Sequence, residues 1–214
     1  MTHFSVLVQF AAGEIDEDSY IQQAIEQKME PYYEGKGNTS GYIDGFMVEP
    51  TTDLFPITED AHSRNEAERK ELLEYMLPYE LPTPLIHIGD IDHESMGKQQ
   101  INKIDNWWKH YKSVMDGKEE DSILFGIDYD LEMMGHKSGI ITRELLFNEY
   151  AGYFKDSTWA VIDTDGIWHS KNKMGWCAIP EGNNNEYLLW DQQYEGRFLS
   201  GDPDIVLMHA RCHV

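Results

Sequence analysis

Both ends of this chain alternate between apolar and polar residues, the pattern of a strand with one buried and one exposed face. The chain opens with MTHFSVLVQF and closes with PDIVLMHARCHV. The apolar faces would be formed by Phe4, Val6, Val8 and Phe10 in the first strand and by Val206, Met208, Ala210, Cys212 and Val214 in the last. The opposite faces would carry His3, Ser5 and Gln9, and His209, Arg211 and His213. If the two strands are neighbours in a sheet, three histidines and an arginine share one surface.

Strand-like and helix-like segments alternate between these ends. The hydrophobic patterns predict strands at 43–48 and 122–128, two or three short strands within 158–179, and helices at 18–29, 58–77, 97–117, 142–153 and 186–199. Ser63 and Glu66 have the spacing of a helix capping box, and Asp165-Gly166 is a tight-turn signal. We therefore expect an α+β fold with an antiparallel or mixed sheet and helices packed on one face, and whether the terminal strands are adjacent in that sheet stays open.

The chain has 214 residues, of which 41% are hydrophobic, and this is enough for one substantial core. We expect a single globular domain over residues 1–214. The segments 31–60 and 78–98 are predicted as loop-rich insertions, because they hold a glycine-rich stretch and a cluster of prolines.

The formal net charge of -22 argues against direct binding to nucleic acid or to an anionic membrane, since both need clustered Lys and Arg. No stretch approaches the length of a membrane span, and the N-terminus lacks the pattern of a signal peptide. Cys177 and Cys212 lie in apolar contexts typical of reduced core thiols. A disulfide between them stays an alternative if their strands are neighbours. These features predict a cytoplasmic protein.

Three segments resemble a family of tailed-bacteriophage proteins. They are THFSVLV at the start, AVIDTDGIWHSKNKMGWCAI at 160–179 and the terminal CHV. The chain departs from the family at 175–178, where Gly-Trp-Cys-Ala replaces a tryptophan pair and glycine, and at Arg211, where the family usually has Asp. The family has no established activity, so the resemblance implies a phage origin, with the host cytoplasm as location, and no mechanism.

Two sets of candidate site residues follow from the sequence. The first, for a ligand, is Trp168, His169, Trp176 and Arg211. The second, for a divalent transition metal, is His3, His209 and His213, because neutral imidazole is a common ligand of such metals. The same spacing is also typical of exposed polar residues on a half-solvated sheet. A metal-free variant would use one histidine as a general base and Arg211 to hold an anion.

Three functions stay open at this stage. The first is a phage accessory protein that binds or inhibits a host protein or binds a small ligand. The second is a metal-dependent hydrolase of a nucleotide or phosphate ester that uses the histidines. The third is an acidic decoy that imitates nucleic acid to occupy a host defence protein. The first is favoured, since the chain lacks the phosphate-loop, dinucleotide, Gly-x-Ser-x-Gly, His-Glu-x-x-His and Cys-x-x-Cys motifs.

Overall fold

A computed structural model describes residues 3–15, 21–33, 43–74, 76–77, 84–116, 142–144, 158–171, 173–174, 180–181 and 184–213. The predicted strand at 122–128 and most of the predicted helix at 142–153 lie outside these ranges, as do Trp176 and Cys177. The chain groups into two compact units, Met1–His93 with Asp156–Val214, and Glu94–Lys155. Because a compact unit is not by itself a domain, the single-domain organisation stays a prediction.

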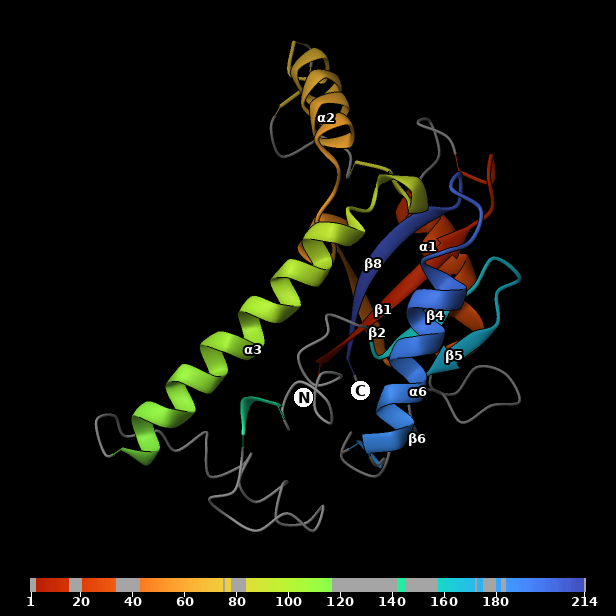
Figure 1. Ribbon diagram of the computed structural model, residues 1–214. Coiled ribbons are helices and arrows are strands. Elements are labelled where there is room, and N and C mark those ends of the chain that lie inside the picture. Colours follow the sequence, from red (N-terminus) through yellow and green to blue (C-terminus); the bar gives the residue numbers. More distant parts are fainter. Residues whose placement is uncertain are drawn as a thin grey trace. The chain divides into compact units, whose positions relative to one another are not determined.

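The first unit is built on a mixed sheet (Figure 1). Its strands are β1 (His3–Phe10), β2 (Gly45–Glu49), β3 (Ile86–His87), β4 (Ala160–Ile162), β5 (Trp168–Ser170) and β8 (Val206–His213). Their order is β2-β8-β1-β4-β5, with β3 also paired to β8. The β1–β4 pair is parallel and the others are antiparallel. A separate two-stranded sheet joins β6 (Lys173–Met174) to β7 (Pro180–Glu181).

The terminal strands pair along their whole length, so they are adjacent in the sheet. The register runs from His3 opposite His213 to Phe10 opposite Val206. Side chains that are direct partners in a ladder point to the same face, so the alternation read from each strand continues across the pair. The two ends of the chain accordingly lie close together in Figure 1.

Helix α1 (Ile21–Met29) covers the apolar face of this sheet. Its Ile25 and Met29 are fully buried, and Pro31 in the following 3-10 turn η1 (Glu30–Tyr32) ends the helix. The core that they join comprises Val6, Val8, Phe10, Ile15, Ile43, Ala160, Ile162, Val206, Met208, Ala210 and Cys212. Each large side chain buried there contributes about 1.5–3 kcal/mol. The predicted α+β class, with a mixed sheet and helical packing on its apolar face, is confirmed.

A second helical segment lies against part of the opposite face. It consists of α6 (Asn184–Gln193) and the π-helical turn η6 (Tyr194–Phe198). Gln9 Nε2 donates to the Phe198 carbonyl at 2.7 Å, and the His169 ring lies 5.1 Å from the Phe198 ring. Leu199 N donates to the Tyr194 carbonyl, five residues back, at 3.1 Å. The helix predicted at 186–199 begins two residues earlier, at Asn184. Its last turn is π-helical, with hydrogen bonds that span five residues instead of four.

Helix α2 (Glu59–Leu72) begins at a different cap from the one predicted. The Thr58 side chain accepts a hydrogen bond from Ala61 N, so Thr58 is the N-cap. Ser63 and Glu66 lie inside the helix, and their capping-box prediction is wrong because the helix begins after Thr58, which accepts from Ala61 N. Two 3-10 turns, η2 (Thr51–Asp53) and η3 (Ile88–Asp90), complete the short elements of this unit.

Helix α3 (His93–Met115) forms the start of the second unit. Ile104 and Tyr111 are buried along its predicted stripe, whereas Ile101 is 42% exposed. The rings of Trp107 and Trp108 stack on that of Tyr111 at 5.3 and 5.7 Å. None of the helices in the described ranges is both long enough and apolar enough to span a membrane.

Candidate functional site

The side chains of β1, β8 and β2 that point away from the α1 core form a polar surface, which we call the histidine face. It comprises His3, Ser5, Glu49, His209, Arg211 and His213, with Asp44 at its margin. The β1–β8 register places His3 opposite His213 and Ser5 opposite Arg211, while β2 places Glu49 opposite His209. The surface predicted from the terminal strands therefore exists, and β2 adds a carboxylate to it.

His3 and His213 form one end of the histidine face. Their rings meet edge to face, with centroids 6.0 Å apart. His213 Nδ1 is paired with the Asp44 carboxylate, and Asp44 N donates to the His213 carbonyl at 3.0 Å. This arrangement fixes the His213 ring and leaves His3, which is exposed, at the rim.

His209 occupies the buried end of the same face. It is only 3% exposed, and its Nε2 lies 3.1 Å from Ser5 Oγ. Its Nδ1 faces Glu49 Oε2 at 3.8 Å, and Arg211 donates to the other Glu49 oxygen at 3.4 Å. Burial lowers the pKa of His209 below its ordinary value and outweighs the opposing effect of Glu49. The imidazole is therefore neutral at pH 7.

The three candidate metal ligands do not form a ligand set. Within the described residues, no group of three His, Cys, Asp or Glu side chains is placed to hold a metal ion. His209 is held by Ser5, and His213 is held by Asp44. The face is thus organised by pairwise contacts between side chains.

The described candidate ligand residues lie on two separate strands of the sheet, Trp168 and His169 on the edge strand β5 and Arg211 on the interior strand β8. His169, on β5, is separated from β8 by β1 and β4, so three strand spacings put it about 14 Å from the β8 residues. Trp168 points to the α1 side, where its ring lies 5.1 Å from that of Tyr32. The structure therefore does not bring either residue together with Arg211, and Trp176 lies outside the described residues.

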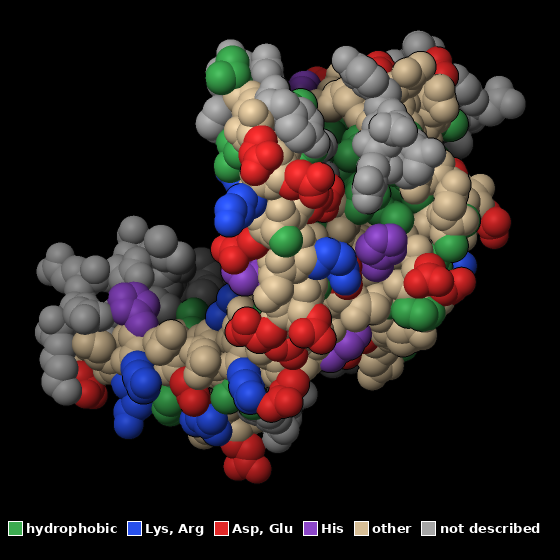
Figure 2. Space-filling view, turned by 90° about the horizontal axis from the view of Figure 1, so that it is seen from above, with side chains coloured by type: hydrophobic (Ala, Val, Ile, Leu, Met, Phe, Trp, Pro, Cys, Tyr) green, Lys and Arg blue, Asp and Glu red, His purple; other side chains and the backbone are tan. Residues whose placement is uncertain are grey.

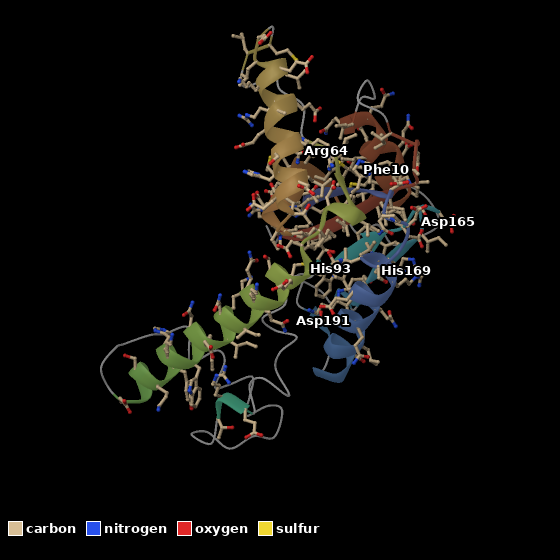
Figure 3. All side chains as sticks on the ribbon, turned by 45° about the horizontal axis from the view of Figure 1, so that its top comes forward. Phe10, Arg64, His93, Asp165, His169 and Asp191 are labelled. Carbon is tan, nitrogen blue, oxygen red and sulfur yellow. The ribbon has the colours of Figure 1, made fainter. Side chains whose placement is uncertain are left out.

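His169 belongs to a second polar cluster, next to α6 (Figure 3). His169 Nε2 lies 2.7 Å from Asp163 Oδ2, and Arg197 is 3.6 Å from the same oxygen. Asp163 Oδ1 accepts hydrogen bonds from Asp165 N and Ile167 N at 3.1 and 2.9 Å. Burial opposes ionisation of Asp163, but these hydrogen bonds outweigh it and hold its pKa below the ordinary value. Both carboxylate oxygens of Asp163 are therefore engaged by groups of the protein itself, and we interpret the cluster as one that stabilises the β4–β5 turn.

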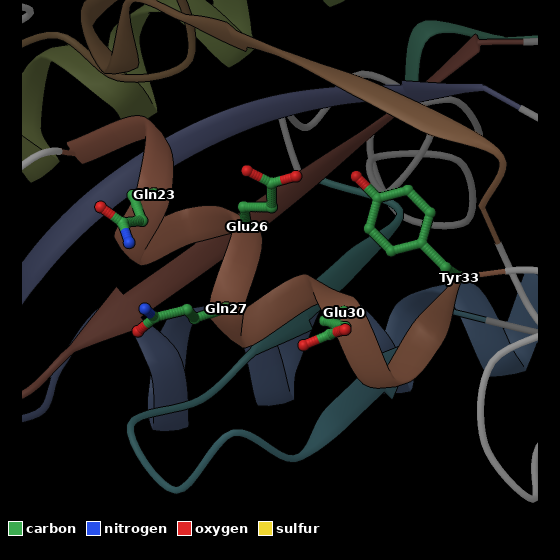
Figure 4. A pocket seen from close by; sticks show the side chains of 5 residues that line it. All are labelled: Gln23, Glu26, Gln27, Glu30 and Tyr33. Atoms are coloured by element: carbon green, nitrogen blue, oxygen red, sulfur yellow. The ribbon is translucent and has the colours of Figure 1, made fainter.

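An open groove runs along the outer side of α1 and η1 (Figure 4). It has a volume of about 490 Å³, and its described lining residues are Gln23, Glu26, Gln27, Glu30 and Tyr33. The Glu26 carboxylate and the Tyr33 hydroxyl face each other across it, as the electrostatic effect of Glu26 on Tyr33 also indicates. Burial, with Glu26 and then Cys212, raises the pKa of Tyr33, so its hydroxyl stays protonated.

A smaller hollow of about 220 Å³ adjoins this groove through the shared residue Gln27. Lys28 lines it, but its ammonium donates to the Gln9 and Thr164 carbonyls at 2.8 and 3.1 Å and pairs with Glu14 at 3.1 Å. The charge of Lys28 is therefore largely neutralised, so it does not offset the Glu26 carboxylate that lines the groove.

The sequence predictions missed the groove and two members of the histidine face. Glu26 and Glu30 are four residues apart on a helix, which would have placed both carboxylates on one side. Ser5 was placed on the polar side of its strand but not as a candidate. Glu49 ends a predicted strand, and nothing local indicates which strand it pairs with.

No protein-family description, no curated protein and no solved structure matches this chain significantly.

Proposed function

We propose that this chain is a binding protein that takes a cationic side chain, Lys or Arg, of a partner protein into the α1–η1 groove. The observation that carries the proposal is the groove itself, where two carboxylates, two amides and a protonated phenol surround about 490 Å³. Carboxylates accept charge-assisted hydrogen bonds from a guanidinium or ammonium group, and the amides supply further acceptors. An aromatic wall adds a cation–π contact.

The net charge of -22 supports a partner with a basic surface, since it accelerates encounter with positively charged proteins. The resemblance to tailed-phage proteins makes a host protein in the host cytoplasm the natural partner. Binding would inhibit that protein where its basic surface carries its own function.

The acidic-decoy alternative requires a continuous negative face. On the face seen in Figure 2, Asp and Glu side chains are interspersed with Lys and Arg instead of forming one continuous patch. On that face, the distribution gives no support to imitation of a nucleic acid backbone.

Isothermal titration calorimetry with a hexa-arginine peptide tests this proposal. Glu26→Gln and Glu30→Gln should each weaken binding about three- to fivefold, the value of one exposed ion pair. The matched control is Glu71→Gln, which removes the same charge from the exposed surface of α2, outside the groove. Equal weakening by all three variants would show that only net charge attracts the peptide, and the proposal would fail.

A further inference from the structure

Ser5 and His209 stand in the relation of a nucleophile and its base. They lie on neighbouring antiparallel strands, where Leu7 is the direct partner of His209 and Ser5 is the next residue of β1 on the same face. This diagonal position brings Ser5 Oγ to 3.1 Å from His209 Nε2. The distance is within hydrogen-bond reach, as transfer of the serine proton to imidazole requires.

Glu49 lies on the other side of the same imidazole. Its Oε2 is 3.8 Å from His209 Nδ1, and β2 holds it there as the direct ladder partner of His209. At this distance Nδ1 makes no hydrogen bond to Glu49, and the carboxylate acts through its charge, which favours a proton on Nδ1 and leaves Nε2 free to accept from Ser5. Two strands from distant parts of the chain thus position His209 from both sides.

A hydrolytic site needs a neutral, shielded base and a nucleophile that the substrate can reach, and His209 and Ser5 differ in burial in this way. His209 is 3% exposed and neutral, and so can act as a base. Ser5 is only partly buried, and Arg211, its direct cross-strand partner, has a side chain that is 47% exposed. A substrate can therefore approach Ser5 from solvent, while the Arg211 guanidinium is directed toward Glu49 on β2, on the other side of β8.

We propose that Ser5, His209 and Glu49 form a catalytic triad that hydrolyses carboxylic esters. This activity is separate from the groove function, because α1 covers the other face of the sheet. The two proposals therefore fail or hold independently.

The chemistry proceeds in two balanced steps. Ser5 Oγ attacks the ester carbonyl carbon while its proton passes to His209 Nε2, and collapse of the adduct expels the alcohol, which takes that proton. Water then attacks the acyl-serine ester and gives one proton to His209. The carboxylic acid leaves, and the proton returns to Ser5.

A fluorophosphonate probe tests the triad on the full chain, because it phosphonylates an activated serine with loss of fluoride. Intact mass and peptide mapping should place one label on Ser5. Glu49→Gln should slow labelling at least tenfold, His209→Gln at least a hundredfold, and Ser5→Ala should abolish it. Ser170→Ala, which changes a partly buried strand serine on β5, is the matched control and should label like the wild type.

Turnover of p-nitrophenyl acetate should follow the same order of variants. Because His209 is buried, its variant could lose the fold, so circular dichroism is recorded for each protein and Glu49→Gln serves as the second test. The triad is refuted if Ser5 is not labelled, or if a folded Glu49→Gln variant labels at the wild-type rate.

Discussion

His213 lies directly opposite Gly45 in the β2–β8 ladder, and a β-carbon at Gly45 would come within 2.6 Å of His213 Nε2. The imidazole ring therefore occupies the space that any other residue at position 45 would need. This contact joins the edge strand β2 to the C-terminal strand, at the end of the face where His3 also meets His213.

Replacing Gly45 with alanine should force the His213 ring out of its position. We expect Gly45→Ala to lower the free energy of unfolding by about 1 kcal/mol, because the atom that the new β-carbon meets is the outer end of the partly exposed His213 ring. Urea denaturation measures this loss, and Gly45→Ala combined with His213→Ala should recover most of it. Gly97→Ala is the control, because a β-carbon there meets nothing within 4 Å and alanine favours the helix. No recovery in the double variant would contradict the contact.

The cap of α2 gives a second prediction. Thr58→Ala removes the acceptor for Ala61 N and should lower the free energy of unfolding by about 1 kcal/mol. Ser63→Ala, inside the helix, should leave it nearly unchanged. Far-UV circular dichroism and urea denaturation of both variants decide between the two caps, and a larger loss for Ser63→Ala would restore the capping box read from the sequence.

Asp163 should make stability depend on acid pH. Its folded-state pKa is lowered, so its contribution is complete above the unfolded value of about 3.9 and is lost as pH falls through the folded pKa. Asp163→Asn should therefore be less stable than the wild type at pH 7, with the gap narrowing below about pH 4. Asp165→Asn, an exposed change in the same turn, should show no such gap. A gap for Asp163→Asn that is constant with pH would disprove this role.

Cys212 should be chemically inert in the folded protein. It is fully buried in the α1 core, and burial raises the pKa of its thiol to about 12, so almost no thiolate forms. In a Cys177→Ser background, a disulfide reagent at pH 8 should modify Cys212 at least about a hundredfold more slowly than in denaturant. Rapid modification of the native protein would show that this part of the core opens readily.

The terminal strands themselves were predictable because each carries its own period-2 pattern, whereas their pairing and register join distant parts of the chain and come from the structure. Helices α1 and α6 were predictable from apolar residues spaced three or four apart, which is also a local pattern. Pro31 sets the end of α1, and a π-helical turn follows α6. Sequence alone could not reveal Glu49 beside His209, because the partner of β2 is chosen by long-range packing.

Burial was the other property hidden from the sequence. His209, Arg211 and His213 have the same spacing, yet the structure buries the first, exposes the second and leaves the third between them. Trp168 and His169 are adjacent on a strand, so their side chains point to opposite faces of the sheet and cannot line the same site. Their distance from Arg211 follows from the strand order, which no local pattern specifies.

Binding of a basic partner at α1 and η1 can be mapped by amide hydrogen exchange with and without the hexa-arginine peptide. We expect slower exchange concentrated in residues 21–33, with α2 unchanged, and loss of that protection in a Glu26→Gln, Glu30→Gln variant. Protection spread equally over the acidic surface of α2, or none in residues 21–33 under saturating peptide, would contradict it.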